Sequence, residues 1–172
     1  MNGWGSFPDR LEIAEVFWQT VCAHLTTCLP EEGCGLMGGQ VVDGAARVDA
    51  VWPIENELHS PVRFRMAPEA QVKAYFDFDE RGQELVAIFH SHPNGPDRPS
   101  ETDIAEFAYP GVLTLICVPS AAQSGWSVRA FMIAESQVDE VVVAILPANL
   151  SSDPPDTPPG MPPGIPPQPG PA

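Results

Sequence analysis

The order of segments in this sequence predicts an α/β fold, in which a mixed, curved sheet is flanked by helices. Two stretches, residues 8–28 and 68–80, have the apolar periodicity of amphipathic helices. Residues 85–89 form a continuous apolar run, which is typical of a strand buried on both faces. Four glycines within residues 33–39 indicate a strand at which the sheet bends or another backbone approaches closely.

The first half of the chain supplies a helix followed by strands. Pro8 and Asp9 suit the start of the first helix. His24 lies within this helix, and we interpret it as a helix-face or core-edge histidine. Residues 47–54 alternate as a strand does, and residues 62–66 are predicted to form a further short strand.

The second half supplies a short helix and the remaining strands. Ser100 is predicted to be the N-cap of the short helix, because Asp103 follows three residues later in a register like that of a capping box. Residues 113–118, 126–134 and 138–146 are predicted to be strands separated by turns.

Composition divides the chain at residue 147. Residues 1–146 are long enough for one domain with a sizeable core. Eleven of the 26 residues from 147 to 172 are proline, which predicts a disordered or semi-extended tail. The tail could be a ligand for an aromatic-lined groove, but we favour a solubilising role.

The charge of the chain bears on its partners and its compartment. The formal net charge is −15, from 23 acidic and 8 basic side chains, and this charge disfavours binding to nucleic acid. No run of about 18 apolar residues is present to span a membrane. The N-terminus does not resemble a signal peptide, so we expect a cytoplasmic protein. We expect all four cysteines to be reduced and mostly buried: Cys22, Cys28, Cys34 and Cys117.

Three side chains suggest a metal site. His90 and His92 are one residue apart on an extended segment, so their side chains face the same way. Asp103 follows after ten intervening residues. Two imidazoles and one carboxylate are a ligand set of catalytic zinc, which keeps a fourth position for water. The alternative is a polar loop with two ordinary histidines, and iron, manganese or cobalt would also accept these ligands.

The motif around these ligands resembles the signature of the JAMM (MPN-type) zinc metallopeptidases. Residues 90–103 read His-x-His-Pro-x-Gly-x-x-x-Pro-Ser-x-x-Asp, and residues 30–36 read Pro-x-Glu-x-Cys-Gly-Leu like the upstream segment of that family. The resemblance covers roughly residues 8–146 and implies an MPN-type fold, which is similar to that of cytidine deaminases. The chain resembles the compact prokaryotic branch of this family. Members that select one ubiquitin linkage carry long insertions around the site, and the short connection at residues 104–111 leaves little room for one.

The resemblance also implies a reaction and a role for each residue. One Zn²⁺ per chain would be held by His90, His92 and Asp103. Glu32 would be the general base that assists attack by zinc-bound water, and Ser100 would donate a hydrogen bond to the developing oxyanion. Ser100 thus has a capping role and a catalytic role that the sequence does not separate.

The implied substrate is a peptide or isopeptide bond that follows the C-terminal tail of a ubiquitin-like or sulfur-carrier protein. Such a protein would be the partner, with no nucleic acid or membrane involved, and the oligomeric state stays open. Among the neighbouring residues, we interpret Glu31 as a solvated turn residue and His59 as a surface histidine. Ser91 should point away from the metal.

Three other functions are alternatives to this one. A non-catalytic MPN scaffold or binding domain keeps the fold but loses the ligands, which are intact here. A zinc deaminase would need His-x-Glu and a later Pro-Cys-x-x-Cys, and this chain has neither. A processing peptidase for some unrelated peptide stays possible on sequence alone.

Overall fold

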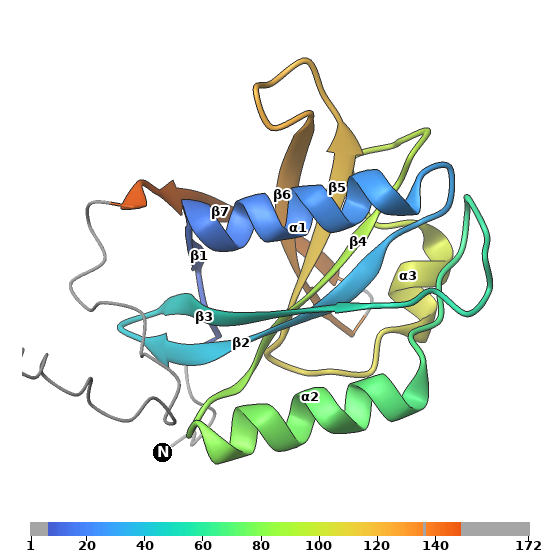
Figure 1. Cartoon of the computed structure of the whole chain (residues 1–172). Coiled ribbons are helices and arrows are strands. Elements are labelled where there is room, and N and C mark those ends of the chain that lie inside the picture. The colour runs from blue at the N-terminus through green and yellow to red at the C-terminus, as the bar shows by residue number, and fades with distance from the viewer. Residues whose placement is uncertain (1–6, 136, 149–172) are drawn as a thin grey trace, which may run out of the picture.

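The computed structural model describes residues 7–135 and 137–148. Within them, three helices are interspersed among the strands along the chain (Figure 1). The strands are β1 (Arg10–Ala14), β2 (Cys34–Val42), β3 (Ala45–Ile54), β4 (Glu84–Ser91), β5 (Leu113–Pro119), β6 (Trp126–Ala134) and β7 (Gln137–Leu146). The helices are α1 (Glu15–Cys28), α2 (Pro68–Glu80) and α3 (Glu101–Glu106).

The sheet is mixed and so strongly curved that it closes into a barrel. Its strands hydrogen-bond in the order β1-β3-β2-β4-β5-β6-β7, and β1 also pairs with β7. β1 is parallel to β3 and to β7, and β4 is parallel to β5, whereas the other neighbours are antiparallel. The predicted α/β class with a mixed, curved sheet is confirmed.

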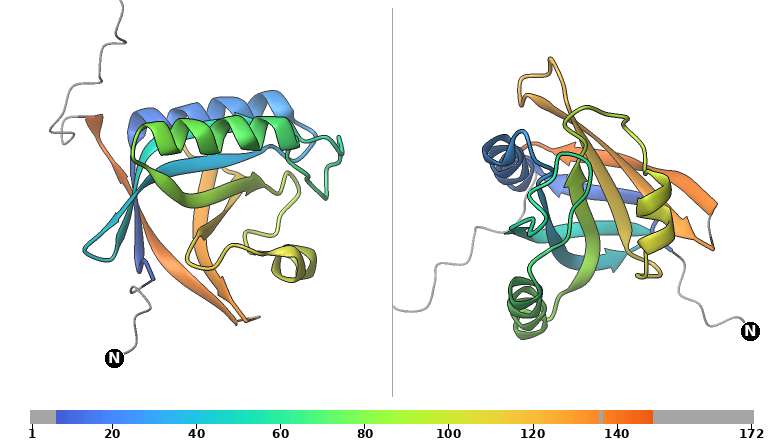
Figure 2. Two further views of the ribbon diagram at one scale, coloured as in Figure 1. Left: turned by 90° about the horizontal axis from the view of Figure 1, so that it is seen from below. Right: turned by 90° about the vertical axis from the view of Figure 1, so that its right-hand side faces the viewer.

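Two hydrophobic clusters lie on opposite faces of β2, β3 and β4. One cluster fills the space between the sheet and α1 and includes Trp18, Leu25 and Phe89. The other packs beneath α2 and includes Phe78 and Ile88. Figure 1 shows these strands between α1 and α2, and Figure 2 shows α3 at the opposite side of the barrel from both helices.

The start of the first helix was predicted too early. Residues 10–14 form β1, and α1 begins only at Glu15. Leu11 and Ile13 fit a helical pattern in the sequence, but both point into the barrel from a strand and are at most 1% exposed. β1 exists because it pairs with β3 and β7, which are distant in the sequence, so local periodicity could not reveal it.

The predicted short strand at residues 62–66 was wrong as well. Only an isolated bridge between Asn56 and Met66 forms there. The Asn56 side chain binds the N–H of Arg65 and the C=O of Arg63, so a side chain occupies positions that a neighbouring strand would use.

The glycines of β2 do mark a bend and a close approach, as predicted. The register of β2 against β3 shifts between Gly38 and Gly39. At Gly35, a Cβ would lie 2.4 Å from the carbonyl oxygen of Trp52 and from the ring of Phe89, so no side chain fits there. β2 can therefore pair closely with β3 on one side and, on the other, with β4, the strand that carries the histidines.

Three further expectations concern the cysteines, membrane-spanning helices and the C-terminal tail. The four cysteines are free thiols, and all but Cys28 are buried, as expected. No helix in the described part of the chain has the length and apolar character needed to cross a membrane. The predicted tail at 147–172 lies almost entirely outside the described residues, so the domain boundary stays a prediction.

Candidate metal centre

Strand β4 carries the two histidines to one point at its end. His90 is in the strand, and His92 extends the pairing with β5 because its N–H donates to the carbonyl of Cys117 (2.9 Å). The two Nε2 atoms lie 3.1 Å apart, so both side chains face the same way, as the alternation of a strand requires. Between them, Ser91 points away, and its Oγ accepts the N–H of Gly33 (2.9 Å).

The first turn of α3 brings Asp103 to the same point. Ser100 caps the helix in a full capping box, in which the Asp103 N–H donates to Ser100 Oγ and the Ser100 N–H donates to Asp103 Oδ2. Ser100 Oγ also donates to Asp103 Oδ2 (2.7 Å). These bonds fix the carboxylate so that Oδ1 lies 3.2 Å from His90 Nε2 and Oδ2 lies 3.4 Å from His92 Nε2.

The spacing of these atoms is close to that around a tetrahedral ion. Zinc bonds of about 2.0–2.1 Å in a tetrahedron separate neighbouring ligand atoms by about 3.3 Å. The two Nε2 atoms are 3.1 Å apart, and each lies near a different oxygen of Asp103, at 3.2 Å from Oδ1 for His90 and 3.4 Å from Oδ2 for His92. The cluster is the one candidate metal site that His, Cys, Asp and Glu side chains form among the described residues. Its donor atoms are therefore arranged as a metal ion would need them.

The loop after β4 orients the ring of His92. His92 Nδ1 donates to the carbonyl oxygen of Pro96 (2.7 Å), which directs Nε2 toward His90 and Asp103. The adjacent Asp97 forms an ion pair with Arg129 of β6 (3.1 Å) and thereby holds this loop against the sheet. The His90 ring stacks on Phe64, with 4.4 Å between ring centroids.

The protonation states suit a cation. Burial raises the pKa of Asp103, but hydrogen bonds from His90, His92 and Ser100 outweigh it and hold this pKa well below its usual range. Burial lowers the pKa of His90. Burial also lowers the pKa of His92, but hydrogen bonds to Asp103 and Pro96 outweigh it and raise this pKa. The metal-free centre thus offers an ionised carboxylate and a neutral His90, and metal binding would release any proton held by His92 Nε2.

Glu32 stands beside the three ligands. Cys34 pairs with His90, and the Ser91 N–H donates to the carbonyl of Gly33, so Glu32 comes next to His92 on the same face. Glu32 is only 4% exposed. Burial raises its pKa to about 7; the charge of Asp103 adds to this rise, and that of His92 opposes it. This carboxyl group therefore gains or loses a proton near neutral pH.

A cleft of about 250 Å³ opens beside the cluster. Its walls are residues 62–66 on one side and the region of α3 on the other, and Arg63 forms an ion pair with Glu106 between them (2.9 Å). The cleft is lined by Val62, Arg63, Phe64, Arg65, Met66, Ile88, His90, Ser100, Thr102, Asp103, Glu106, Phe107, Tyr109 and Thr114. An extended peptide that lay in this cleft would pass directly over the candidate ligands.

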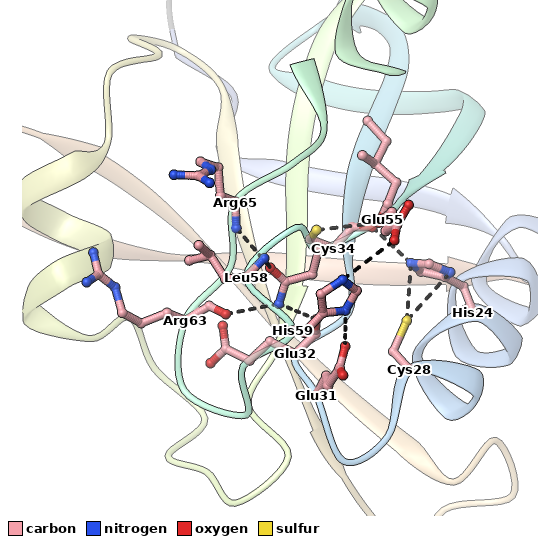
Figure 3. Close-up of polar contacts among 12 residues, drawn as sticks. His24, Cys28, Glu31, Glu32, Cys34, Glu55, Leu58, His59, Arg63 and Arg65 are labelled. Atoms are coloured by element: carbon pink, nitrogen blue, oxygen red, sulfur yellow. Dashed lines mark hydrogen bonds and ion pairs between the residues drawn. The ribbon is translucent and has the colours of Figure 1, made fainter. Parts of the chain in front are cut away.

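The other histidines lie outside the cluster. His24 lies at the edge of the core, as predicted, and its Nε2 is 3.0 Å from the carbonyl oxygen of Cys34. His59 is a surface histidine, also as predicted; its side chain is 61% exposed and pairs with Glu31 (3.2 Å). Figure 3 shows His59 beside Glu31 and His24 beside Cys28.

Sequence reasoning missed two residues that shape the site, Phe64 and Asn56. Phe64 belongs to the segment that was predicted as a strand, and its stacking on His90 depends on the path of that segment. Asn56 is only 5% exposed and donates a hydrogen bond to the backbone of Glu32 (3.0 Å). A single asparagine after a strand is an ordinary turn signal, so nothing local marked it.

The barrel with its flanking helices and the two-histidine, one-aspartate cluster define a JAB/MPN-type domain with a candidate metal site. A family model described as prokaryotic homologs of the JAB domain matches residues 15–134. The chain therefore belongs to the prokaryotic JAB/MPN (JAMM) domain family.

Individual relatives agree with this assignment. A probable TtuB-protein conjugate cleaving protease of Thermus thermophilus is 37% identical over 125 residues, which are 72% of this chain and 75% of that protein. A desampylase of Haloferax volcanii is 34% identical over 52% of this chain and 64% of its own length. The solution structure of a Desulfitobacterium hafniense protein superposes with a TM-score of 0.71 at 31% identity, covering 78% of this chain and 92% of that one.

Proposed function

We propose that this protein is a zinc-dependent peptidase or isopeptidase that hydrolyses the bond after the C-terminal tail of a ubiquitin-like or sulfur-carrier protein. The convergence of the His90 and His92 Nε2 atoms and the Asp103 carboxylate within 3.1–3.4 Å of one another, beside the buried Glu32, carries the proposal. The names of two relatives, a conjugate cleaving protease and a desampylase, support the substrate class.

In this mechanism His90 Nε2, His92 Nε2 and one oxygen of Asp103 would hold the metal. A zinc ion bound there would activate water for attack and polarise the scissile carbonyl. Asp97 and Arg129 keep the loop after β4 in place, and through the Pro96 carbonyl this loop orients the His92 ring. The ligands are thus set before a substrate arrives.

Glu32 acts as the general base and then as the general acid. It takes a proton from the attacking water and passes it to the nitrogen that leaves, so the products are a free carrier carboxylate and a free amine. In the metal-free site, burial raises the Glu32 pKa to about 7, and a general base is most effective when its pKa lies near the operating pH. Nearby charges on a metal and a substrate will move this value from that of the metal-free site.

The cleft suits a thin, extended tail. Its wall at residues 62–66 is not part of the barrel sheet, and the Arg63–Glu106 ion pair narrows the space between that wall and α3. A tail that ends in glycines would fit where larger side chains would not, and its backbone could pair with the wall by strand addition. The short connection after α3 leaves the cleft without a large additional lobe.

A cleavage assay tests the proposal. We expect the zinc-loaded protein to release a ubiquitin-like or sulfur-carrier protein from a conjugate with a lysine side chain or a C-terminal extension, and to leave unrelated peptides intact. Treatment with a chelator should abolish cleavage, and added Zn²⁺ should restore it. A protein that binds zinc and the carrier but cleaves no conjugate would support the scaffold alternative instead.

Ser100 is assigned the oxyanion hydrogen bond in addition to its cap. Its hydroxyl donates to Asp103 Oδ2 in this structure, so the hydroxyl would have to turn toward the substrate during the reaction. We expect Ser100→Ala to lower kcat by about 10²–10³-fold. Loss of the cap should also cost about 1 kcal/mol of stability.

Two measurements separate these roles of Ser100. Ser100→Thr keeps the Oγ atom and should retain both the cap and most of the activity, which a cleavage assay and a denaturant melt would show. If Ser100→Ala lost stability but kept its full kcat, the hydroxyl would be a helix cap only.

A further inference from the structure

The side-chain amide of Asn56 is buried at the centre of a hydrogen-bond cluster next to Glu32. Asn56 lies two residues after the end of β3 and is 5% exposed. Its Nδ2 donates to the carbonyl oxygens of Glu32 (3.0 Å) and Arg63 (3.0 Å). Its Oδ1 accepts the N–H groups of Leu58 (3.1 Å) and Arg65 (3.1 Å), and Figure 3 shows these partners gathered beside Glu32.

The chemistry of the partners fixes the orientation of this amide. Carbonyl oxygens can only accept and backbone N–H groups can only donate, so the nitrogen of Asn56 must face Glu32 and Arg63. An asparagine side chain has two donor hydrogens and two acceptor lone pairs, and all four are used here. Because the group is buried and fully bonded, a substitution leaves several backbone groups without partners.

The same segment binds both backbone groups of Glu32. The Glu32 C=O accepts from Asn56, and the Glu32 N–H donates to the carbonyl of Ser60 (2.8 Å). β2 begins only at Cys34, whose partner in β3 is Ile54, the last residue of that strand. Glu32 therefore lies beyond the ladder between β2 and β3, and the segment after β3 takes over the hydrogen bonds that fix it.

This segment also reaches the metal ligands. Phe64, which follows Arg63, stacks on the ring of His90 (4.4 Å between centroids). Residues 62–66 form a wall of the cleft. One buried amide thus connects the backbone of Glu32 to the segment that covers His90.

We propose that Asn56 is a positioning residue that holds Glu32 against the candidate metal centre and aligns residues 62–66 as the cleft wall. The proposal rests on the function proposed above, because Glu32 must be the base for its placement to affect the rate. Asn56 itself touches neither a metal ligand nor the reacting atoms.

Two variants of Asn56 test the proposal against a matched control. Asn56→Ala removes all four hydrogen bonds, and Asn56→Asp keeps the acceptor while it removes both donors. Gln71 offers the control, because its Nε2 donates to the carbonyl of Met66 (3.0 Å) at the far end of the same segment without contacting Glu32. Circular dichroism and thermal melting establish whether each variant is folded. If Asn56→Ala does not fold, Asn56→Asp alone is used for the test.

We expect both Asn56 variants to keep one zinc ion per chain and to lose about 10–100-fold in kcat. A displacement of the Glu32 carboxylate by about 1 Å would cause a loss of this size. Gln71→Ala should stay within about twofold of the natural protein. In a Glu32→Gln background, Asn56→Ala should cause little further loss of kcat, because the group it positions is already gone. Equal losses in both backgrounds would overturn the proposal.

Hydrogen exchange gives a readout that needs no activity. In the metal-free natural protein, the Glu32 amide should be protected by its bond to Ser60. Asn56→Asp should speed its exchange by about tenfold or more, whereas Gln71→Ala should not. Unchanged protection in Asn56→Asp would contradict the positioning role. The two proposals can fail separately. Full activity in Glu32→Gln would show that Glu32 is not the general base. The exchange measurement would still decide whether Asn56 positions Glu32.

Discussion

Replacing His92 with alanine is expected to remove the metal and the cleavage activity together. The Nε2 atom of His92 lies 3.1 Å from that of His90 and 3.4 Å from Asp103 Oδ2, so it is one corner of the ligand set. Two protein ligands hold zinc far less tightly than three. Even the loss of a residue that only hydrogen-bonds to a ligating histidine costs about 10–100-fold in metal affinity. We therefore expect a loss of more than about 100-fold in zinc affinity and no measurable turnover.

Elemental analysis after dialysis measures the first effect, and conjugate cleavage measures the second. His59→Ala is the matched control, because its side chain is 61% exposed and lies outside the cluster. This control should keep one zinc ion per chain and full activity. One zinc ion per chain in His92→Ala would place the metal somewhere else.

The candidate ligands could be predicted from sequence because local rules place them. Strand alternation fixes the shared direction of His90 and His92, and the capping box fixes Asp103 in the first turn of α3. Both rules act over a few residues, and the structure follows both. The roles assigned to Glu32 and Ser100 are not local in this way, and they stay proposals that came from the family resemblance.

The parts that could not be predicted depend on partners far away in the sequence. β1 is a strand only because β3 and β7 lie on either side of it. Residues 62–66 have the composition of a strand, yet Asn56 takes up their hydrogen bonds instead. Closure of the sheet into a barrel likewise follows from the β1–β7 pairing, which no periodicity encodes.

Replacing Glu32 with glutamine is expected to lower kcat by about 10²–10⁴-fold and at the same time to stabilise the metal-free protein. Loss of a general base costs about 10²–10⁴-fold in rate, and zinc should stay bound because all three ligands remain. The stability effect follows from burial, which raises the pKa of Glu32 from 4.5 to about 7 in the folded state.

The sign of the stability effect follows from this raised pKa. The unfolded chain ionises Glu32 near pH 4.5, whereas the folded chain resists ionisation until about pH 7. Below pH 4.5 the carboxyl group is protonated in both states and costs nothing, but between these values the folded state loses stability as the pH rises. Above pH 7 the loss is complete, and it amounts to roughly 3 kcal/mol for a pKa difference of this size.

Urea unfolding of the chelator-treated proteins at pH 4.5 and pH 8 measures this difference. Glutamine stays neutral, so Glu32→Gln should match the natural protein at pH 4.5 and exceed its stability at pH 8. Glu31→Gln is the control, because Glu31 pairs with His59 at the surface, and it should show no comparable gain. Equal stability of Glu32→Gln and the natural protein at pH 8 would mean that the folded state carries the ionised carboxylate at no cost. A gain in stability coupled to a loss of turnover would instead show that the chain keeps a costly buried carboxylate for the reaction it performs.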